Sequence, residues 1–240
     1  MKRTCDASKR SLGKRAGIIV ILAVLGCLFF AAPAMAALAV DGSFADWTGQ
    51  PNIPDGLGDA AAYADVDAFF YANNPNDENL YFMIKRRDNG LNYSSAVIYK
   101  MLFDIDRDGK YNKNTDRYAT VSYTPGNKTN LGTVSVALYR GNGGKSIASY
   151  SGTWGESSAV GGQRCEFSIS MANLGTYPYN PIHIYTTSIP SLYSTTTLDR
   201  VPGTSYLQWS PIPTLGWVLL GVFVVGAVIF GVRRMRMAAQ

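Results

Sequence analysis

A run of carboxylates after an apolar segment carries the clearest chemical signal in the sequence. Asp104, Asp106 and Asp108 stand at alternate positions, Gly109 follows at once, and Asp116 comes shortly afterwards. Carboxylates at this spacing converge on one hard cation, and Ca²⁺ takes about six to eight oxygen ligands. Gly109 permits the sharp reversal that brings the third carboxylate back. The sequence therefore predicts a structural calcium ion bound by Asp104, Asp106, Asp108 and Asp116.

This run resembles the first half of an EF-hand loop, with two differences. The twelfth position counted from Asp104 is Thr115, where an EF-hand has a bidentate glutamate. The residues before the run, 97–103, have the composition of a strand rather than a helix. We therefore expect a calcium loop at the end of a β-strand. The alternative is a solvated acidic turn with Arg107 and Lys110 as neighbours.

The sequence offers little for catalysis. Its single histidine, His183, lies in an alternating, strand-like run, so a histidine metal cluster has no second histidine ligand. Two carboxylates serve glycoside hydrolysis in many enzymes. Asp65, Asp67 and Glu166 are available for such a pair, but nothing in the sequence indicates their separation. We expect a protein that is not an enzyme.

The elements that position these residues are expected to be strands. Short runs rich in β-branched and aromatic residues alternate with turn formers such as Asn, Gly and Pro, and helical periodicity is nearly absent. This pattern predicts an all-β fold, an antiparallel β-sandwich of jelly-roll or immunoglobulin-like type. The predicted strands are 67–72, 80–85, 96–104, 118–123, 134–139, 164–170 and 182–187. Residues 171–174 are expected to form one helical turn.

Both ends of the 240-residue chain are apolar segments with basic flanks. Residues 1–36 combine a basic start, an apolar run and the small residues Ala-Met-Ala, which predicts a signal peptide. An uncleaved anchor and lipid attachment at Cys27 are the alternatives. Residues 215–232 carry no charge, and a helix of this length spans about 27 Å of the roughly 30 Å hydrocarbon core. Three arginines follow, which by the positive-inside rule places the tail in the cytoplasm.

The predicted organisation is a signal peptide (1–36), a β-sandwich domain (37–204), a spacer (205–214), a transmembrane or sorting helix (215–232) and a basic cytoplasmic tail (233–240). The domain is therefore expected outside the cell, extracellular or periplasmic, and anchored to the membrane or cell surface. The whole sequence has a net charge of +5, but residues 37–210 hold 13 Lys and Arg against 16 Asp and Glu, a net of −3. This charge gives no support to a nucleic-acid partner. Cys165 is the only cysteine of that segment, so no internal disulfide is expected.

Several segments resemble family 9 carbohydrate-binding modules and the related DOMON-like sandwiches. They are 40–47 (VDGSFADW), 80–82 (LYF), 166–175 (EFSISMANLG) and 199–202 (DRVP), and they extend over most of 38–203. The resemblance implies a calcium-stabilised β-sandwich. Family members that bind sugar stack it between exposed aromatic side chains, for which Trp154 and Trp47 are the candidates. Trp154 lies in a Gly/Ser-rich segment, 151–155, that reads as a loop, whereas core packing beside Phe44 is the alternative for Trp47.

The C-terminus resembles the IPTL-type sorting signals of bacterial surface proteins. Residues 212–215 read Ile-Pro-Thr-Leu, and a tryptophan, an apolar segment and an arginine cluster follow. Such signals usually carry Ser-Glu-Trp after the leucine, whereas here Gly-Trp follows directly. The resemblance implies a sorting protease as a partner, and a plain membrane anchor is the alternative.

Two functions remain open from the sequence. The first is a binding module for a polysaccharide or a cell-wall glycan. The second is a purely structural component of the surface or the extracellular matrix, without a small ligand. A remote third is a DOMON-like redox module that holds haem through Met83 and His183, since some DOMON-like sandwiches use such a pair.

Overall fold

A computed structural model describes residues 37–56, 58–61, 63–74, 77–87, 97–124, 133–155, 164–191 and 194–211. All of them belong to one compact unit of the chain, Ala37–Gly216. The predicted signal peptide, the 215–232 helix and the basic tail lie outside the described residues. A membrane-spanning helix, judged by length and apolar character, is not found in the described part of the chain.

The described residues form eleven strands and two short helical segments. The helical segments are the 3-10 turn η1 (Phe44–Trp47) and α2 (Met171–Leu174), and α2 is the expected helical turn. The strands are β1 (Asn52–Pro54), β2 (Val66–Asn73), β3 (Asn79–Arg86), β4 (Val97–Asp104), β5 (Arg117–Thr124), β6 (Thr133–Arg140), β7 (Ala148–Gly155), β8 (Arg164–Ser170), β9 (Ile182–Ile189), β10 (Asp199–Val201) and β11 (Leu207–Trp209).

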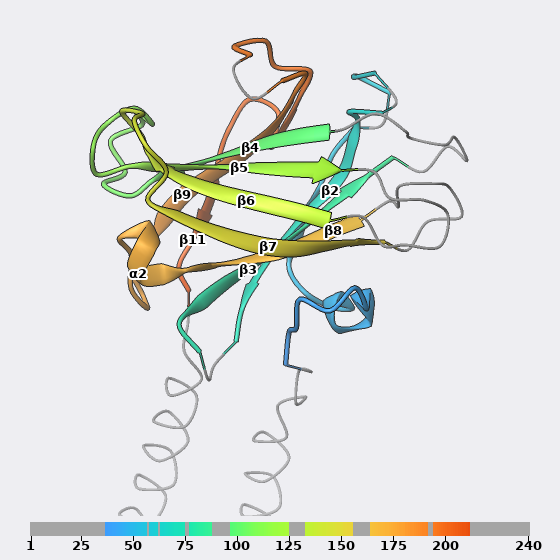
Figure 1. Ribbon diagram of the computed structural model, residues 1–240, viewed down its shortest axis with the longest axis horizontal. Coiled ribbons are helices and arrows are strands. Elements are labelled where there is room, and N and C mark those ends of the chain that lie inside the picture. The colour runs from blue at the N-terminus through green and yellow to red at the C-terminus, as the bar shows by residue number, and fades with distance from the viewer. Residues whose placement is uncertain are drawn as a thin grey trace, which may run out of the picture. The chain divides into compact units, whose positions relative to one another are not determined.

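The strands form one antiparallel sheet in the order β1-β2-β3-β8-β7-β6-β5-β4-β9-β10, and β11 also pairs with β9. This confirms the all-β, antiparallel class. In Figure 1, β4, β5, β6 and β7 lie side by side, and β2, β3 and β9 pass behind them. The order comes back on itself where the amide of Val66 in β2, the neighbour of the end strand β1, donates to the carboxylate of Asp199 in β10 at 2.6 Å. The two layers expected of a sandwich are thus parts of one continuous, nearly closed sheet.

Alternation along the strands creates the core. In β4, Val97, Tyr99, Met101 and Phe103 are buried, and the side chains between them are half-buried on the outer face. Consecutive side chains of a strand point to opposite faces, so one apolar face of each strand meets the same core. The corresponding faces of β2, β3, β5, β6, β8 and β9 complete this main core.

A second, smaller core explains why both faces of β3 are apolar from Leu80 to Ile84. Leu80, Phe82 and Ile84 face the main core, whereas Tyr81 and Met83 face the N-terminal segment. That segment contributes three buried side chains to the second core, Leu38, Phe44 and Trp47. A strand that is covered on both faces has no need of polar residues at alternate positions.

Two expectations about the domain's boundaries and loops are wrong. Residues 148–155 form β7 rather than a loop, because they pair with both β6 and β8. Gly152 fits there since a Cβ atom would collide with the carbonyl oxygen of Glu166 in the neighbouring strand. The domain also continues past residue 204 into the predicted spacer. Leu207–Trp209 forms β11, and the carbonyl of Pro211 accepts a hydrogen bond from the amide of Tyr179 at 2.8 Å.

Candidate metal site and neighbouring clusters

The predicted carboxylates lie in the hairpin loop that joins β4 to β5. Asp104 is the last residue of β4, and Asp116 immediately precedes β5. One oxygen from each of Asp104, Asp106 and Asp116 lies within 4.8 Å of the other two. Asp104 and Asp116 are 0 % exposed, whereas Asp106 is exposed. The structure thus brings together three of the four predicted ligands.

Backbone hydrogen bonds fold the loop around Asp104. The amide of Gly109 donates to its Oδ2 at 2.9 Å, and the amide of Asp108 donates to its Oδ1 at 3.2 Å. Gly109 has a φ of 81°, and Arg107 before it has a φ of 59°. Both values lie in the left-handed region, which glycine adopts without a steric penalty. Gly109 therefore makes the reversal that returns the chain to the end of β4.

Asp116 is held on the other side of the loop. Its carboxylate accepts the amide of Lys113 at 2.9 Å and the amide of Ile105 at 3.3 Å. Its carbonyl accepts the amide of Gly141, at the start of the β6–β7 turn, at 2.8 Å. Burial raises the pKa of Asp116 above its ordinary value of 3.8, because water is removed from the charged form. The carboxylate is thus fixed in position but poorly solvated.

The fourth predicted ligand, Asp108, is not a member of this group. Its carboxylate pairs with the ammonium of Lys113, which also lies 3.0 Å from Oδ2 of Asp106. The hydrogen bond from Lys113 lowers the pKa of Asp106, and the carboxylates of Asp108 and Asp106 raise the pKa of Lys113. The loop therefore supplies a cation of its own. This cation is Lys113, rather than the Arg107 and Lys110 that the sequence suggested.

His183 extends the polar contacts of Asp104 into β9. Its Nδ1 lies 3.3 Å from Oδ2 of Asp104, and the two residues are paired across β4 and β9. The imidazole stacks on the ring of Tyr206, with centroids 3.9 Å apart. His183 is 7 % exposed and thus covers the buried side of Asp104. His183, the single histidine of the sequence, thus contacts the β4–β5 loop through the carboxylate of Asp104.

The chemistry of this loop suits a hard cation. Three carboxylates converge, two of them are fully buried, and the exposed ammonium of Lys113 contacts Asp106. An all-oxygen donor set of this kind is typical of Ca²⁺ sites, in which carbonyl oxygens and waters complete the shell. The residues present therefore fit calcium, with Asp104, Asp106 and Asp116 as the carboxylate ligands.

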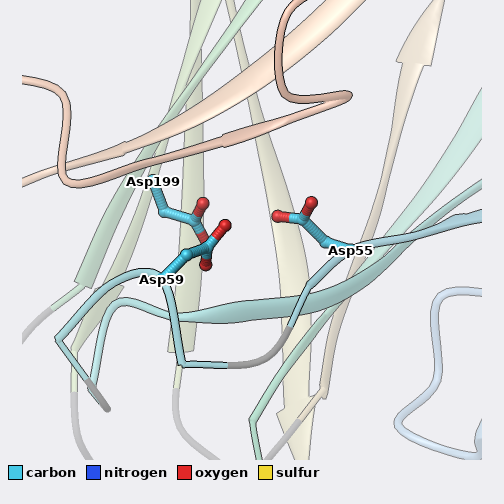
Figure 2. Close-up of side chains that lie close together, drawn as sticks. All are labelled: Asp55, Asp59 and Asp199. Atoms are coloured by element: carbon cyan, nitrogen blue, oxygen red, sulfur yellow. The ribbon is translucent and has the colours of Figure 1, made fainter.

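A second group of carboxylates was missed by the sequence analysis. One oxygen from each of Asp55, Asp59 and Asp199 lies within 4.8 Å of the other two. Figure 2 shows these carboxylates pointing toward one another from the segment after β1 and from the start of β10. Asp199 is 6 % exposed and accepts the amides of Val66 and Arg200, both at 2.6 Å. Asp55 and Asp199 are far apart in sequence, so only the closure of the sheet brings them together.

Burial and charge repulsion in this group predict a pH-dependent stability. Burial, followed by the charge of Asp199, raises the pKa of Asp55 from 3.8 to about 6. A raised folded-state pKa means that the charged form is disfavoured by folding. Its unfavourable contribution is absent below pH 3.8, grows as the pH rises, and is complete above about pH 6. Asp55→Asn should therefore raise the melting temperature at pH 7.5 and change it little at pH 4.

The measurement is a series of thermal melts in chelator across that pH range. Glu78→Gln, an exposed carboxyl outside both acidic groups, is the matched control. An equal gain from Asp55→Asn at both pH values would contradict the raised pKa of Asp55.

Trp47 lies in the second core rather than on the surface. It is 2 % exposed, and its indole nitrogen donates to Oε2 of Glu166 at 2.8 Å. Core packing, the alternative stated for Trp47, is therefore what the structure has, and a sugar ring cannot stack on it there. The other candidate, Trp154, belongs to β7, and its backbone pairs with Cys165. The side chain of Trp154 lies outside the described residues.

Glu166 is the anchor of the N-terminal segment. Besides Trp47, its carboxylate accepts the amides of Asp41 at 2.8 Å and Gly42 at 2.7 Å and the hydroxyl of Thr153 at 2.8 Å. The residue is 0 % exposed. Burial raises the pKa of Glu166 above its ordinary 4.5, while these donors act in the opposite direction. Four donors directed at one buried carboxylate explain why an acidic residue stands in the middle of β8.

The other carboxylates considered for catalysis also have structural partners. Asp65 is fully buried and accepts the amide of Gly58 at 2.8 Å, and Asp67 pairs with Lys85 across β2 and β3. Met83, one of the two haem-ligand candidates, is buried in the second core. The other candidate, His183 in β9, contacts Asp104 at the end of β4.

A scan against protein-family models, a search of curated proteins and a search of solved structures found no match to this chain.

Proposed function

We propose that this chain is an exported, surface-anchored protein whose all-β domain is stabilised by calcium at the β4–β5 loop and binds carbohydrate or cell-wall glycan. The observation that carries the calcium assignment is the meeting of Asp106 with two fully buried carboxylates, Asp104 and Asp116. Burying ionised carboxylates is costly unless a counter-charge accompanies them. A divalent cation at this position offsets that cost and holds both ends of the hairpin together.

Lys113 competes with calcium for the carboxylate of Asp106. Its ammonium bridges Asp106 and Asp108. Calcium displaces this ammonium from Asp106, because both cations would bind the same carboxylate. A variant without the lysine charge, Lys113→Met, should therefore bind calcium more tightly than the wild type. The carboxylate of Asp106 in the loop is therefore neutralised either by Lys113 or by calcium.

The test of the calcium assignment is thermal melting with calcium and with chelator. At a calcium concentration of about 100 Kd the stabilisation is about 2.7 kcal/mol. For a domain of this size that raises the melting temperature by roughly 5–10 °C. The double variant Asp104→Ala/Asp106→Ala should lose the rise, while Glu78→Gln keeps it. Equal melting curves with and without calcium in the wild type would remove the proposal.

Export and anchoring are supported by the sequence of the two ends. Residues 1–36 have the sequence pattern of a signal peptide. The apolar segment 215–232 and the arginines after it have the pattern of a membrane anchor or sorting signal. The partners proposed at this end are the membrane and a sorting protease. The β-sandwich type implied by the family resemblance belongs to the same proposal.

The binding function has one specific rival. Because Trp47 is buried, one of the two tryptophans proposed to contact a glycan lies inside the domain. This favours the purely structural surface or matrix role as the second candidate. A glycan array separates the two, since a binding module gives signals for a class of saccharides and a structural component gives none.

A further inference from the structure

The outer face of the sheet carries an aromatic and cationic patch beside the calcium loop, and Tyr111 of that loop packs against Tyr185 in the patch. Side chains of β4, β5, β6 and β9 that alternate with the core residues lie on this face. Most of the patch is half-buried, and Tyr206 is 46 % exposed. We call this patch the tyrosine face and define it by Tyr118, Tyr139, Tyr185, Tyr206, Lys100 and Arg200.

Rings and cations are in direct contact on the tyrosine face. Tyr118 and Tyr139 are stacked, with centroids 4.8 Å apart and planes 9° from parallel. The ammonium of Lys100 lies 4.7 Å from the ring centroid of Tyr118. The guanidinium of Arg200 lies 4.1 Å from the ring centroid of Tyr185. The face therefore contains two units that each consist of a tyrosine ring and a cation.

The register of the strands fixes the spacing of these two units. Lys100 and Arg200 pair with Thr187 from opposite sides, so the two cations stand two strands apart. Tyr118 and Tyr185 flank one residue of β4 in the same way. Neighbouring strands are about 4.8 Å apart, which puts both separations at about 10 Å. A ligand that lies across the strands meets a ring and a cation twice.

The charge of the tyrosine face is opposite to that of the domain. Among the described strand residues that face outward on β4, β5, β6, β9 and β10, the only carboxylate is Asp104, which is fully buried. Lys100 and Arg200 are the accessible charges there. Residues 37–210 as a whole carry a net charge of −3. The face is a local cationic strip on an acidic domain, and this selects an anionic ligand.

We propose that the tyrosine face binds an acidic polysaccharide across the strands, an inference that rests on the proposed binding function. Sugar rings pack against the edges of Tyr118 and Tyr185, because Tyr139 and Lys100 lie over the ring of Tyr118 and Arg200 lies over the ring of Tyr185. The carboxylates of uronic acid residues accept hydrogen bonds from Lys100 and Arg200, and such charge-assisted bonds are the stronger kind. A polymer fits better than a single sugar because the two units repeat.

Two cations favour a sparsely charged polymer over nucleic acid. A nucleic-acid strand carries a phosphate at every nucleotide, and its binding is dominated by many phosphate contacts. Lys100 and Arg200 supply only two such contacts on this face. A polysaccharide with one carboxylate per repeat needs no more than these two.

The test uses the full chain, exported with its own leader and extracted in detergent, and hyaluronan as the probe. Hyaluronan whose carboxylates are methyl-esterified is the neutral comparison, and a thymidine oligonucleotide is the nucleic-acid comparison. We expect binding to hyaluronan that weakens with salt, and a loss of about tenfold or more for Lys100→Gln/Arg200→Gln and for Tyr118→Ser. Lys145→Gln, an exposed lysine in the β6–β7 turn, should bind as the wild type does. Melting curves in calcium verify that each variant is folded.

Several outcomes would overturn the inference. Unchanged binding by the folded Lys100→Gln/Arg200→Gln and Tyr118→Ser variants removes the tyrosine face as the site. Equal binding of the esterified polymer, or stronger binding of the oligonucleotide, removes the acidic polysaccharide as the ligand. Binding of neutral glycans alone overturns this inference and leaves the proposed glycan-binding function standing. If no glycan binds, both this inference and the proposed glycan-binding function are wrong.

Discussion

Glu166→Ala should lower the free energy of unfolding by about 3–5 kcal/mol, because the amides of Asp41 and Gly42, the indole N–H of Trp47 and the hydroxyl of Thr153 all lose their acceptor. Each donor left unsatisfied in the interior costs about 1–3 kcal/mol, and local relaxation recovers part of the sum. For a domain of this size the expected fall in melting temperature is roughly 6–20 °C. Thermal or urea unfolding measures it.

The matched variants show whether the four donors are the cause. Glu166→Gln replaces one oxygen with an amide nitrogen, so at least one donor loses its acceptor, and the expected cost is about 1–3 kcal/mol. Glu78→Ala removes an exposed glutamate and should stay within about 0.5 kcal/mol of the wild type. A cost for Glu166→Ala no larger than that of Glu78→Ala would contradict the role of Glu166 as the anchor of the N-terminal segment.

Gly141→Ala should destabilise the domain and also weaken calcium binding. A Cβ atom at Gly141 would lie 2.8 Å from Cβ of Asp116 and 2.9 Å from the carbonyl oxygen of Tyr111, which is closer than real contacts allow. The β6–β7 turn and the calcium loop would have to move apart, and overpacking of this kind costs about 1–3 kcal/mol. Since Asp116 moves with its loop, the calcium-induced rise in melting temperature should shrink as well.

Gly203→Ala is the control for this prediction. A Cβ atom at Gly203 meets no atom within 4 Å, and its φ is not in the left-handed range. The control should therefore be near neutral in both stability and calcium response. A wild-type calcium response in Gly141→Ala would show that the loop does not depend on the turn behind it.

The sequence predicted the strands better than their arrangement. The strand-like runs at 67–72, 134–139 and 182–187 all lie within observed strands, because alternation and β-branched content are local properties. The Gly/Ser-rich β7 has no such local signal, since its strand conformation comes from pairing on both sides. The union of all strands into one sheet is likewise a property of pairing between distant segments. Local composition does not encode this pairing of distant strands.

The acidic sites differ in the same way. Asp104, Asp106 and Asp116 belong to one hairpin, so their spacing alone suggested that they meet. The exclusion of Asp108 depends on where Lys113 reaches, which the spacing does not encode. Asp55, Asp59 and Asp199 come together only when β10 returns to β2. Trp47 illustrates the same limit, because the buried acceptor that receives its indole N–H is far away in the sequence.

Calorimetric titration of chelator-stripped protein with calcium chloride tests the central claim most directly. We expect a site that binds calcium in the wild type and in Asp55→Asn, disappears in Asp104→Asn/Asp106→Asn, and strengthens in Lys113→Met. Wild-type protein that gives no heat of binding would contradict the assignment of the β4–β5 loop as a calcium-binding site. A site that survives in the Asp104→Asn/Asp106→Asn variant would contradict it as well.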